Sequence, residues 1–356
     1  MLDFFYTFTK MHYAKLFLFS FLFVFCMHAY AQDAVVISQD AEKAYNEGVI
    51  AFKNKNFEAA LTAFSKAIAL RPDFDKAYFN RGNTKIELAD FKGALSDFSS
   101  SLQLDQTNGK AYFGRGFSYW KTKDLTAAVK DFTEAIRFSP DYAQSYYYRG
   151  EIAFLNGNYK NAIADFSAAI QQKADYAYAY NDRGSAKRML DDYKGAAADY
   201  EMASTLDPRL IFAYTNLAYV LSKDGDKSGA LKAYQDALKA KGDDPLTYNN
   251  RGALYFEMRK YKEAIDDFTK AISLKADYTF AYNNRGAARL KAGDKEGAVA
   301  DFSKAIELDP KYGYAYLNQG TMKEGDRDNQ GACKDWKQAQ ALGVKMATGF
   351  LNDCDK

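Results

Sequence analysis

The dipeptide Arg-Gly returns at a fixed spacing of 34 residues along this chain. It occurs at Arg81-Gly82, Arg115-Gly116, Arg149-Gly150, Arg183-Gly184, Arg251-Gly252 and Arg285-Gly286. Two periods separate Gly184 from Gly252, and Ala218 occupies the missing place, while Gly48 and Gly320 extend the series on either side. A period of this length predicts one small structural element copied many times, rather than several globular domains.

Two further columns of residues keep the same period. An alanine follows each of these small residues by 12 positions, at Ala60, Ala94, Ala128, Ala162, Ala196, Ala230, Ala264, Ala298 and Ala332. An aromatic residue follows four positions later, at Phe64, Phe98, Phe132, Phe166, Tyr200, Tyr234, Phe268, Phe302 and Trp336. Pro72, Pro140, Pro208 and Pro310 share a third phase. The columns define nine repeats, at 41–74, 75–108, 109–142, 143–176, 177–210, 211–244, 245–278, 279–312 and 313–346.

This pattern of a small residue, Ala-x3-aromatic and a late proline resembles the tetratricopeptide repeat, over 306 of the 356 residues. The resemblance implies an all-α fold, a right-handed α-solenoid superhelix of nine helix-turn-helix repeats. Stacked helix pairs would share one continuous core, because a single pair cannot bury its apolar face. Residues 32–40 would form a short segment before the repeats, and residues 347–356 a C-terminal cap.

The expected start of each second helix carries a capping residue. Asp or Asn stands there at Asn56, Asp90, Asp124, Asn158, Asp192, Asp226, Asp294 and Asp328, with Lys260 as the one exception. Such side chains accept hydrogen bonds from the free N–H groups of the first helical turn. Asp244-Pro245 is typical of an N-cap followed by proline at the first helical position, so it predicts a helix start.

The N-terminal segment has the order of a secretory signal. Lys15 precedes an apolar run over residues 16–27, and Ala29-Tyr30-Ala31 follows it. We therefore predict a signal peptide over 1–31, cleaved before Gln32, with Met11 as an alternative start. The run is shorter than the roughly 20 residues of a membrane-spanning helix, so no stable span is expected in the mature chain. A periplasmic or cell-envelope location follows from this interpretation.

Composition then excludes several classes of function. The only histidines, His12 and His28, lie in the predicted signal, so the mature chain would lack Ser-His-Asp, Cys-His and His-ligated zinc arrangements. A net charge of +2 offers no basic field for nucleic acid. No metal or cofactor is implied, and we do not expect an enzyme.

An aspartate recurs in the second helix, and it accompanies the arginine of the Arg-Gly pair. Repeats one and six, with Glu47/Ala63 and Leu217/Ala233, lack both partners together. Repeat nine keeps Asp335 with Gln319 in the arginine place. We predict structural ion pairs within repeats, such as Arg81–Asp97 and Arg251–Asp267. Acid–base catalysis by the aspartates is the less favoured alternative.

A row of asparagines stands near the start of the first helix in the later repeats. It consists of Asn216, Asn250, Asn284 and Asn318, with Asn249 and Asn283 preceding two of them. The row is similar to the asparagine ladder by which some tetratricopeptide proteins hold an extended peptide on a concave face. A carboxamide offers a donor and an acceptor, which match a peptide group. The alternative is that these residues cap or brace neighbouring helices.

Aromatic residues concentrate on the first helices of the early repeats. Phe113 and Trp120 are the members that we consider for ligand binding, because an aromatic groove receives apolar side chains or sugar rings. Packing in the core is the favoured alternative.

The sequence thus predicts an exported scaffold that binds a peptide or protein partner on its concave face. The alternative is a structural subunit of an envelope complex, assembled through its ends or convex face. The oligomeric state is open.

Cys333 and Cys354 provide the first testable prediction. Two cysteines in an exported mature chain predict a disulfide that closes the C-terminal cap, with buried free thiols as the alternative. The mature chain, unfolded without reductant, should therefore show no reactive thiol, and reduction should lower its stability by about 3 kcal/mol. A Cys333→Ser/Cys354→Ser variant is the control, and two reactive thiols in the parent would rule out the bridge.

Overall fold

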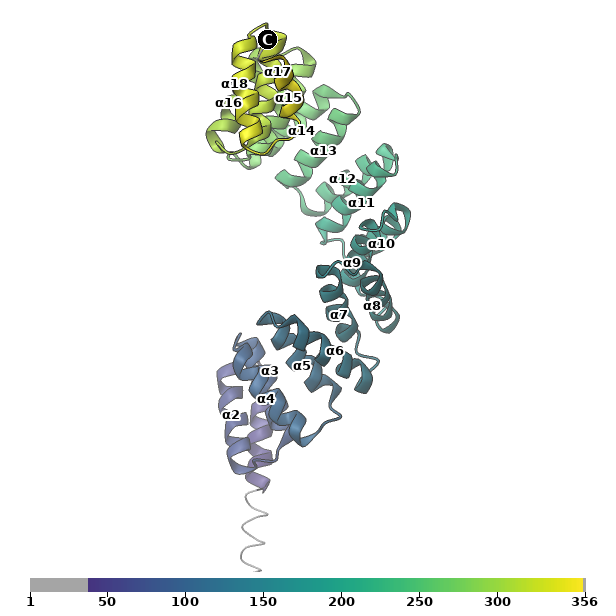
Figure 1. The fold of residues 1–356 in the computed structure, drawn as a ribbon. Helices are drawn as coiled ribbons and strands as arrows, with labels where there is room; N and C mark the ends of the chain where they lie inside the picture. Colours follow the sequence, from purple (N-terminus) through teal and green to yellow (C-terminus); the bar gives the residue numbers. More distant parts are fainter. Residues whose placement is uncertain (1–37, 355–356) are drawn as a thin grey trace, which may run out of the picture. The chain divides into compact units, whose positions relative to one another are not determined.

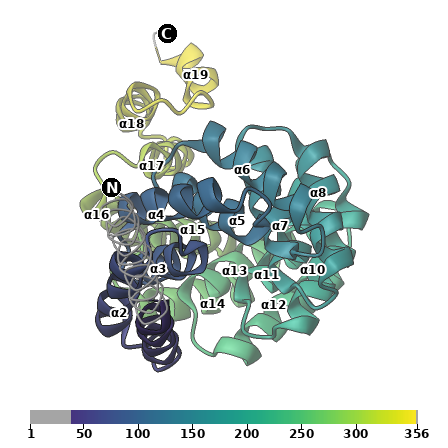
Figure 2. The ribbon, with the colours of Figure 1, turned by 90° about the horizontal axis from the view of Figure 1, so that it is seen from below.

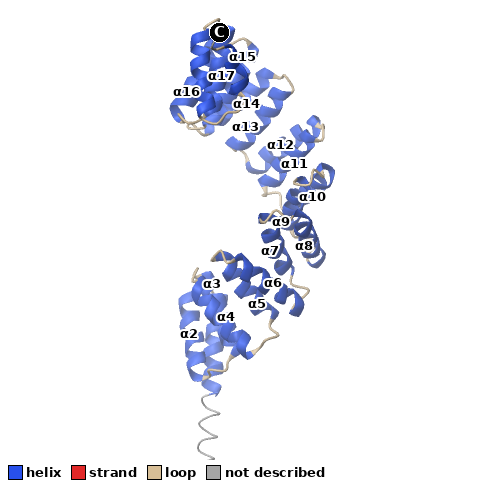
Figure 3. Cartoon of the chain, in the orientation of Figure 1, coloured by secondary structure: helices blue, strands red, loops and turns tan. Residues whose placement is uncertain are grey.

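A computed structural model describes residues 38–354. Helices and the turns between them make up this whole range, and no strand occurs in it (Figure 3). The predicted signal over 1–31 and the alternative start at Met11 lie outside the described residues.

The contacts divide the chain into two compact parts, 1–174 and 175–356, which are described separately. The N-terminal part holds repeats one to four. A helix over 38–53 is followed by α2 (Phe57–Leu70), α3 (Asp75–Glu87), α4 (Phe91–Leu104), α5 (Gly109–Lys121), α6 (Leu125–Phe138), α7 (Ala143–Leu155) and α8 (Tyr159–Gln172).

The C-terminal part holds repeats five to nine and the cap. Its helices are α9 (Ala177–Arg188), α10 (Tyr193–Leu206), α11 (Ile211–Lys223), α12 (Lys227–Lys241), α13 (Pro245–Glu257), α14 (Tyr261–Leu274), α15 (Thr279–Ala292), α16 (Lys295–Leu308), α17 (Gly313–Gly325), α18 (Asn329–Ala341), α19 (Ala347–Phe350) and the 3-10 helix η1 (Leu351–Asp353).

Each repeat is a helical hairpin, and within each part the hairpins pack on one another in chain order (Figures 1 and 2). In the N-terminal part α3 packs on α4 and α4 on α5; in the C-terminal part α9 packs on α10 and α10 on α11. From repeat two onward, the first helix begins at the first residue of the 34-residue repeat defined above. The fold is therefore an α-solenoid of tetratricopeptide type within each part.

The hairpin closes where a glycine of the first helix meets an aromatic ring of the second. A Cβ atom added to Gly82 would lie 2.9 Å from a ring carbon of Phe98, which is too close for any side chain at that place. Phe98 itself is fully buried. Gly320 meets Trp336 in the same way in repeat nine. The close approach thus explains both columns of the repeat.

The turn inside each hairpin ends in the predicted cap. Asp90 Oδ1 accepts a hydrogen bond from the Gly93 N–H at 2.9 Å. Between repeats six and seven, Asp244 caps α13 by accepting a hydrogen bond from the Thr247 N–H, as predicted. Asn158 occupies the predicted N-cap position, but its side chain does not make the predicted capping hydrogen bond. Lys260, the exception in sequence, makes none either.

The residue before each N-cap position inside a hairpin has a left-handed backbone. Glycine supplies it in three repeats, for example Gly157 with φ 73°. The other six positions are Lys55, Ala89, Lys123, Asp191, Arg259 and Arg327, with φ between 58° and 69°. The turn therefore requires a conformation that L residues rarely adopt.

Ion pairs join the two helices of a repeat. Arg81 donates to both carboxylate oxygens of Asp97, from Nε at 2.9 Å and from a terminal nitrogen at 2.7 Å. Arg251 and Asp267 make the same two bonds at 2.8 and 2.7 Å. The remaining bidentate pairs are Arg115–Asp131, Arg149–Asp165, Arg183–Asp199 and Arg285–Asp301. These contacts give the aspartate column a structural role.

The arginine also reaches the preceding repeat. Arg81 donates to the hydroxyl of Ser65 at 3.1 Å, and Arg285 to that of Thr269 at 3.2 Å. One side chain therefore ties its own hairpin together and links it to its neighbour.

A second cation one turn further along the first helix supports some of the aspartates. Lys85, Lys187 and Arg289 contact the aspartates of their own repeats within 2.9 Å. In repeat nine, Lys323 binds Asp335 at 2.7 Å, which explains why that aspartate persists opposite Gln319.

The C-terminal cap packs on repeat nine. The Phe350 ring stacks on Trp336 with centroids 5.0 Å apart. The Cys333 and Cys354 sulfurs lie at bonding distance, with the two Cα atoms 5.6 Å apart. The cap thereby covers part of the last hairpin.

Burial of Tyr234 predicts a loss of stability at alkaline pH. Burial, with a smaller contribution from Glu257, raises its pKa to about 12. Between the ordinary value near 10 and 12, the unfolded chain releases this proton and the folded chain keeps it. Stability is therefore present below pH 10 and declines as the pH rises toward 12, by about 2 kcal/mol for this residue.

Urea unfolding at pH 8 to 11.5 tests this, with Tyr234→Phe as the matched variant. Phenylalanine occupies the same column in most other repeats, so the variant should fold and lose less stability over that interval. An identical decline in both proteins would contradict the assignment.

The ion pair of repeat three predicts that removing one partner lowers the unfolding free energy more than replacing both partners. Asp131 is 2% exposed and binds only Arg115, whose pKa its hydrogen bond raises. Asp131→Ala leaves the guanidinium without a counter-charge and should cost about 3 kcal/mol of unfolding free energy. The double variant Arg115→Leu/Asp131→Ala copies the pair found in repeat six, Leu217 and Ala233, and should cost clearly less. A double variant as unstable as the sum of the two single variants would show that the residues act independently.

Candidate functional site

The predicted asparagine row lies on the first helices of the C-terminal part. Asn216, Asn250, Asn284 and Asn318 occupy the sixth position of α11, α13, α15 and α17, and all four are half-buried. Asn249 and Asn283, one position earlier, are buried at 8% and 5% exposure.

Five of these amides form one hydrogen-bonded chain, which we name the amide ladder: Asn249, Asn250, Asn283, Asn284 and Asn318. Asn318 Nδ2 donates to Asn283 Oδ1 at 2.8 Å, and Asn283 Nδ2 donates to Asn284 Oδ1 at 3.4 Å. Asn284 Nδ2 then donates to Asn249 Oδ1 at 3.1 Å, and Asn249 Nδ2 to Asn250 Oδ1 at 3.4 Å. The ladder therefore crosses repeats seven, eight and nine without a gap.

Asn216 belongs to a separate, shorter chain. It donates to Asn181 Oδ1 at 3.2 Å, and Asn181 donates to Asp182 at 2.9 Å. Thr215 stands where repeats seven and eight have Asn249 and Asn283, and its hydroxyl donates to a backbone carbonyl of its own helix. Asn181 was missed from the sequence because repeat five carries aspartate at the following position.

The ladder braces neighbouring repeats and keeps hydrogen-bonding capacity to spare. A carboxamide has two N–H donors and an oxygen with two lone pairs. Asn284 uses one donor toward Asn249 and one lone pair toward Asn283. One donor and one acceptor remain on this half-buried amide, which the bonds already made hold in a fixed orientation. The arrangement suits a peptide group, although peptide binding by these residues stays a prediction.

A second feature of the same face was not predicted from the sequence. The second residue of the first helix is large, apolar and exposed in repeats five to nine: Tyr178 (48%), Phe212 (42%), Leu246 (53%), Phe280 (53%) and Tyr314 (50%). We name these five residues the apolar row. Repeats two to four have Lys76, Lys110 and Gln144 at this place. That contrast between early and late repeats was the signal available in the sequence.

The apolar row and the ladder share one face of each helix. Residues four apart lie one above the other on a helix, so Phe280 is next to Asn284 and Tyr314 next to Asn318. The helices that carry them also contact one another, α9 with α11, α13 with α15 and α15 with α17. Tyr178 and Phe212 have ring centroids 6.1 Å apart, which joins the row across repeats five and six.

Phe113 and Trp120 lie in a packed aromatic cluster of the N-terminal part. Phe113 contacts Phe117, Phe132 and Tyr148 with centroids 5.8 to 6.2 Å apart. Trp120 stacks against Phe117 at 5.7 Å and carries the Lys121 ammonium 4.8 Å from its ring. Both side chains are half-buried, and these contacts are those of the packing alternative. A role in ligand binding stays a prediction.

Within 38–354, no group of three His, Cys, Asp or Glu side chains is placed to hold a metal ion. Over the same range, the helices are too short or too polar for any one of them to cross a membrane.

Solved structures support the fold. A tetratricopeptide repeat protein from Parabacteroides merdae matches 70% of this chain and all of its own, with a TM-score of 0.56 and 17% identity. The C-terminal part of a TPR repeat-containing protein from Cytophaga hutchinsonii matches 77% of this chain and 98% of its own, with a TM-score of 0.52 and 18% identity. At these identities the likeness extends to the fold alone. Comparison with curated proteins gives no match.

Family models match most of the repeat region. Those described as tetratricopeptide repeat match residues 79–143, 113–177, 156–210, 213–244, 245–278 and 279–312, and one described as TPR repeat matches 48–88. Together they span more than half of the chain, and the matches at 245–278 and 279–312 coincide with repeats seven and eight. The chain therefore belongs to the tetratricopeptide repeat family.

Proposed function

We propose that this chain is an exported, non-catalytic scaffold that binds an extended peptide along the first helices of repeats five to nine. Tetratricopeptide repeats commonly mediate protein or peptide binding, which supplies the general role. The observation that carries the specific proposal is the apolar row lying one helical turn from the amide ladder. An aligned set of exposed apolar side chains marks a binding surface on a soluble protein.

The two features suit different parts of one ligand. The spare donor and acceptor of each half-buried asparagine match the N–H and C=O of a peptide group. The apolar row would then take the ligand's side chains. Packed helices lie about 10 Å apart, a distance that an extended chain covers in about three residues. We therefore expect ligands of about twelve residues, with apolar side chains about three residues apart.

The N-terminal part lacks this combination. Lys76 and Lys110 replace the apolar residues, and Gly114 and Tyr148 interrupt the asparagine column. Asn46 and Asn80 are the early members that remain, and Asn80 donates to the Tyr45 hydroxyl at 2.8 Å. Peptide capture is accordingly assigned to the concave side of the C-terminal part.

The proposed location is the periplasm or cell envelope. The signal-like order of residues 1–31 supports it, and a disulfide between Cys333 and Cys354 would form in such an oxidising compartment.

Selection from a display library of random peptides of about twelve residues tests the proposal, with the mature chain 32–356 as bait. A selected peptide should bind at least tenfold more weakly to Asn250→Ala/Asn284→Ala and to Phe280→Ser. Each change removes either paired hydrogen bonds or an exposed apolar contact. Fluorescence anisotropy measures the affinities, and circular dichroism confirms that the variants remain folded.

The matched control is Asn46→Ala/Asn80→Ala, which alters the same column in the N-terminal part. It should leave the affinity unchanged. Selected peptides that bind all four proteins equally would place recognition elsewhere and favour the structural-subunit alternative.

A further inference from the structure

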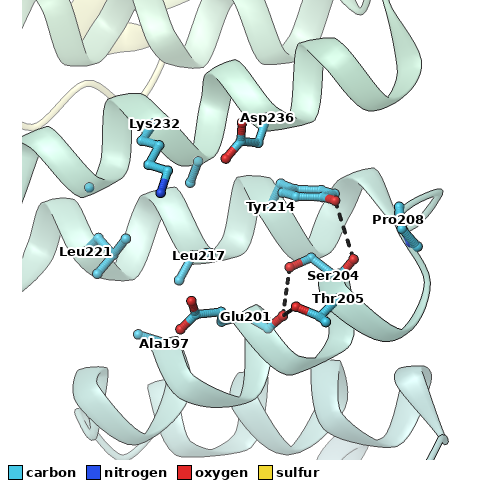
Figure 4. Close-up of a pocket in the computed structure, with 12 residues that line it drawn as sticks. Ala197, Glu201, Ser204, Thr205, Pro208, Tyr214, Leu217, Leu221, Lys232 and Asp236 are labelled. Carbon is cyan, nitrogen blue, oxygen red and sulfur yellow. Dashed lines mark hydrogen bonds between the residues drawn. The ribbon is translucent and has the colours of Figure 1, made fainter.

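Repeat six contains a cleft at the place where six other repeats hold an arginine side chain. It lies between α10 and α12, has α11 as its floor, and has a volume of about 440 Å³ (Figure 4). Figure 4 shows Tyr214, Leu217 and Leu221 on the floor, Glu201 on the α10 wall, and Lys232 and Asp236 on the α12 wall. The walls and floor all belong to the C-terminal part.

The neighbouring repeats show what this place ordinarily holds. In repeat five, the Arg183 guanidinium lies 5.3 Å from the centroid of the Tyr180 ring, one turn earlier on the same helix. In repeat seven, Arg251 lies 5.5 Å from the Tyr248 centroid. The tyrosine face, the aspartate of the second helix and a hydroxyl of the preceding repeat together form a receptor for guanidinium.

Repeat six keeps part of this receptor and lacks its arginine. Tyr214 is in the tyrosine column, but Leu217 stands in the arginine place and Ala233 in the aspartate place. The second cation position is Leu221, so no basic side chain of this first helix enters the cleft. The floor that remains is apolar, apart from the tyrosine.

A carboxylate also lies on the α10 wall of the cleft. Ser65 and Thr269 accept a hydrogen bond from the arginine of the following repeat. The equivalent residue before repeat six is Glu201, which is exposed and lines the cleft. The residue that faces an incoming guanidinium is therefore a carboxylate in repeat six, whereas it is a hydroxyl in repeats two and eight.

We propose that the cleft over Leu217 binds an arginine side chain supplied by a partner protein or peptide. The stem would lie on Leu217 and Leu221, the guanidinium over the Tyr214 ring, and its N–H groups against the Glu201 carboxylate. Arginine suits such a place because its planar head stacks on aromatic rings and pairs with carboxylates.

The other charges around the cleft are compatible with this ligand. Asp236 adds a second carboxylate, which Lys239 contacts from the exposed side at 3.1 Å. Lys232 is the one cation that lines the cleft, and it is exposed. The lining side chains therefore carry two negative charges against one positive charge.

Repeat four provides an internal comparison. The same groove exists between α6 and α8, with a volume of about 450 Å³, and Arg149 and Asp165 are among its lining residues. Its arginine comes from the chain itself and is bound to the aspartate at 2.7 Å. In repeat six the equivalent position is open to an arginine from outside. This proposal does not depend on the amide ladder, because Glu201 and Ala233 lie on second helices.

Methyl NMR of the mature chain 32–356 tests the site. The probes are N-acetyl-arginine methylamide and its citrulline counterpart, which has nearly the same shape and no charge. Titration with the arginine probe should shift the Leu217 and Leu221 methyl signals saturably, and citrulline should not. Glu201→Gln should weaken the arginine affinity at least fivefold, whereas Glu263→Gln on α14 should leave it unchanged.

A second variant separates occupancy from folding. Leu217→Arg/Ala233→Asp restores the pair of the other repeats, so it should fold with an unchanged or higher thermal midpoint and abolish the Leu221 shift. Equal shifts with citrulline, an unaltered affinity in Glu201→Gln, or binding retained by the refilled variant would each overturn the proposal. Equal affinity for a lysine probe would overturn the assignment to guanidinium.

Discussion

The structure depends on the close contact between a glycine of the first helix and an aromatic ring of the second helix in a repeat. At Gly82 and the other glycines of this column, the two helices of a hairpin approach so closely that an added Cβ atom would lie 3.0 Å or less from a ring atom of the second helix, and Ala218 in repeat six is the exception. The aromatic ring fills the space between the two helices beside this contact and is itself buried. Since this contact sets how the two helices meet, it also sets where the arginine, the asparagine and the exposed apolar residue of each repeat are presented.

Arg–Asp ion pairs connect the helices of this framework. A bidentate arginine joins two helices, and its remaining N–H reaches a hydroxyl of the preceding repeat. Such half-buried pairs contribute modestly to net stability but penalise arrangements that leave one charge alone. Repeat six has replaced the pair with Leu217 and Ala233, so apolar packing alone holds the hairpin there. Without the Arg–Asp pair, the surface of repeat six differs from that of the other repeats in shape and charge.

Periodicity made the fold predictable. The glycine, alanine and aromatic columns identify the helices, and their register places the first residue of each first helix from repeat two onward. The Arg–Asp pairs followed from comparing repeats, because partners that disappear together in repeats one and six are expected to touch.

Other features could not be predicted from the periodic columns of residues. Lys323 binding to Asp335 was missed because only one cation position was considered. The apolar row was missed because a single exposed Phe280 is unremarkable in sequence, and its meaning lies in alignment across helices. The hydrogen bonds of the amide ladder likewise depend on which way each carboxamide turns, and no pattern of residue types fixes that.

The left-handed residue before each cap has a consequence for variation along the chain. An L residue in that conformation costs about 1 kcal/mol, and glycine loses a similar amount through its greater freedom when unfolded. The two costs nearly cancel, so Lys, Ala, Asp, Arg and Gly all occur there while the turn stays the same. All nine positions are exposed. The hairpin tips thus form a series of surface sites where the chain can change its chemistry without changing its backbone.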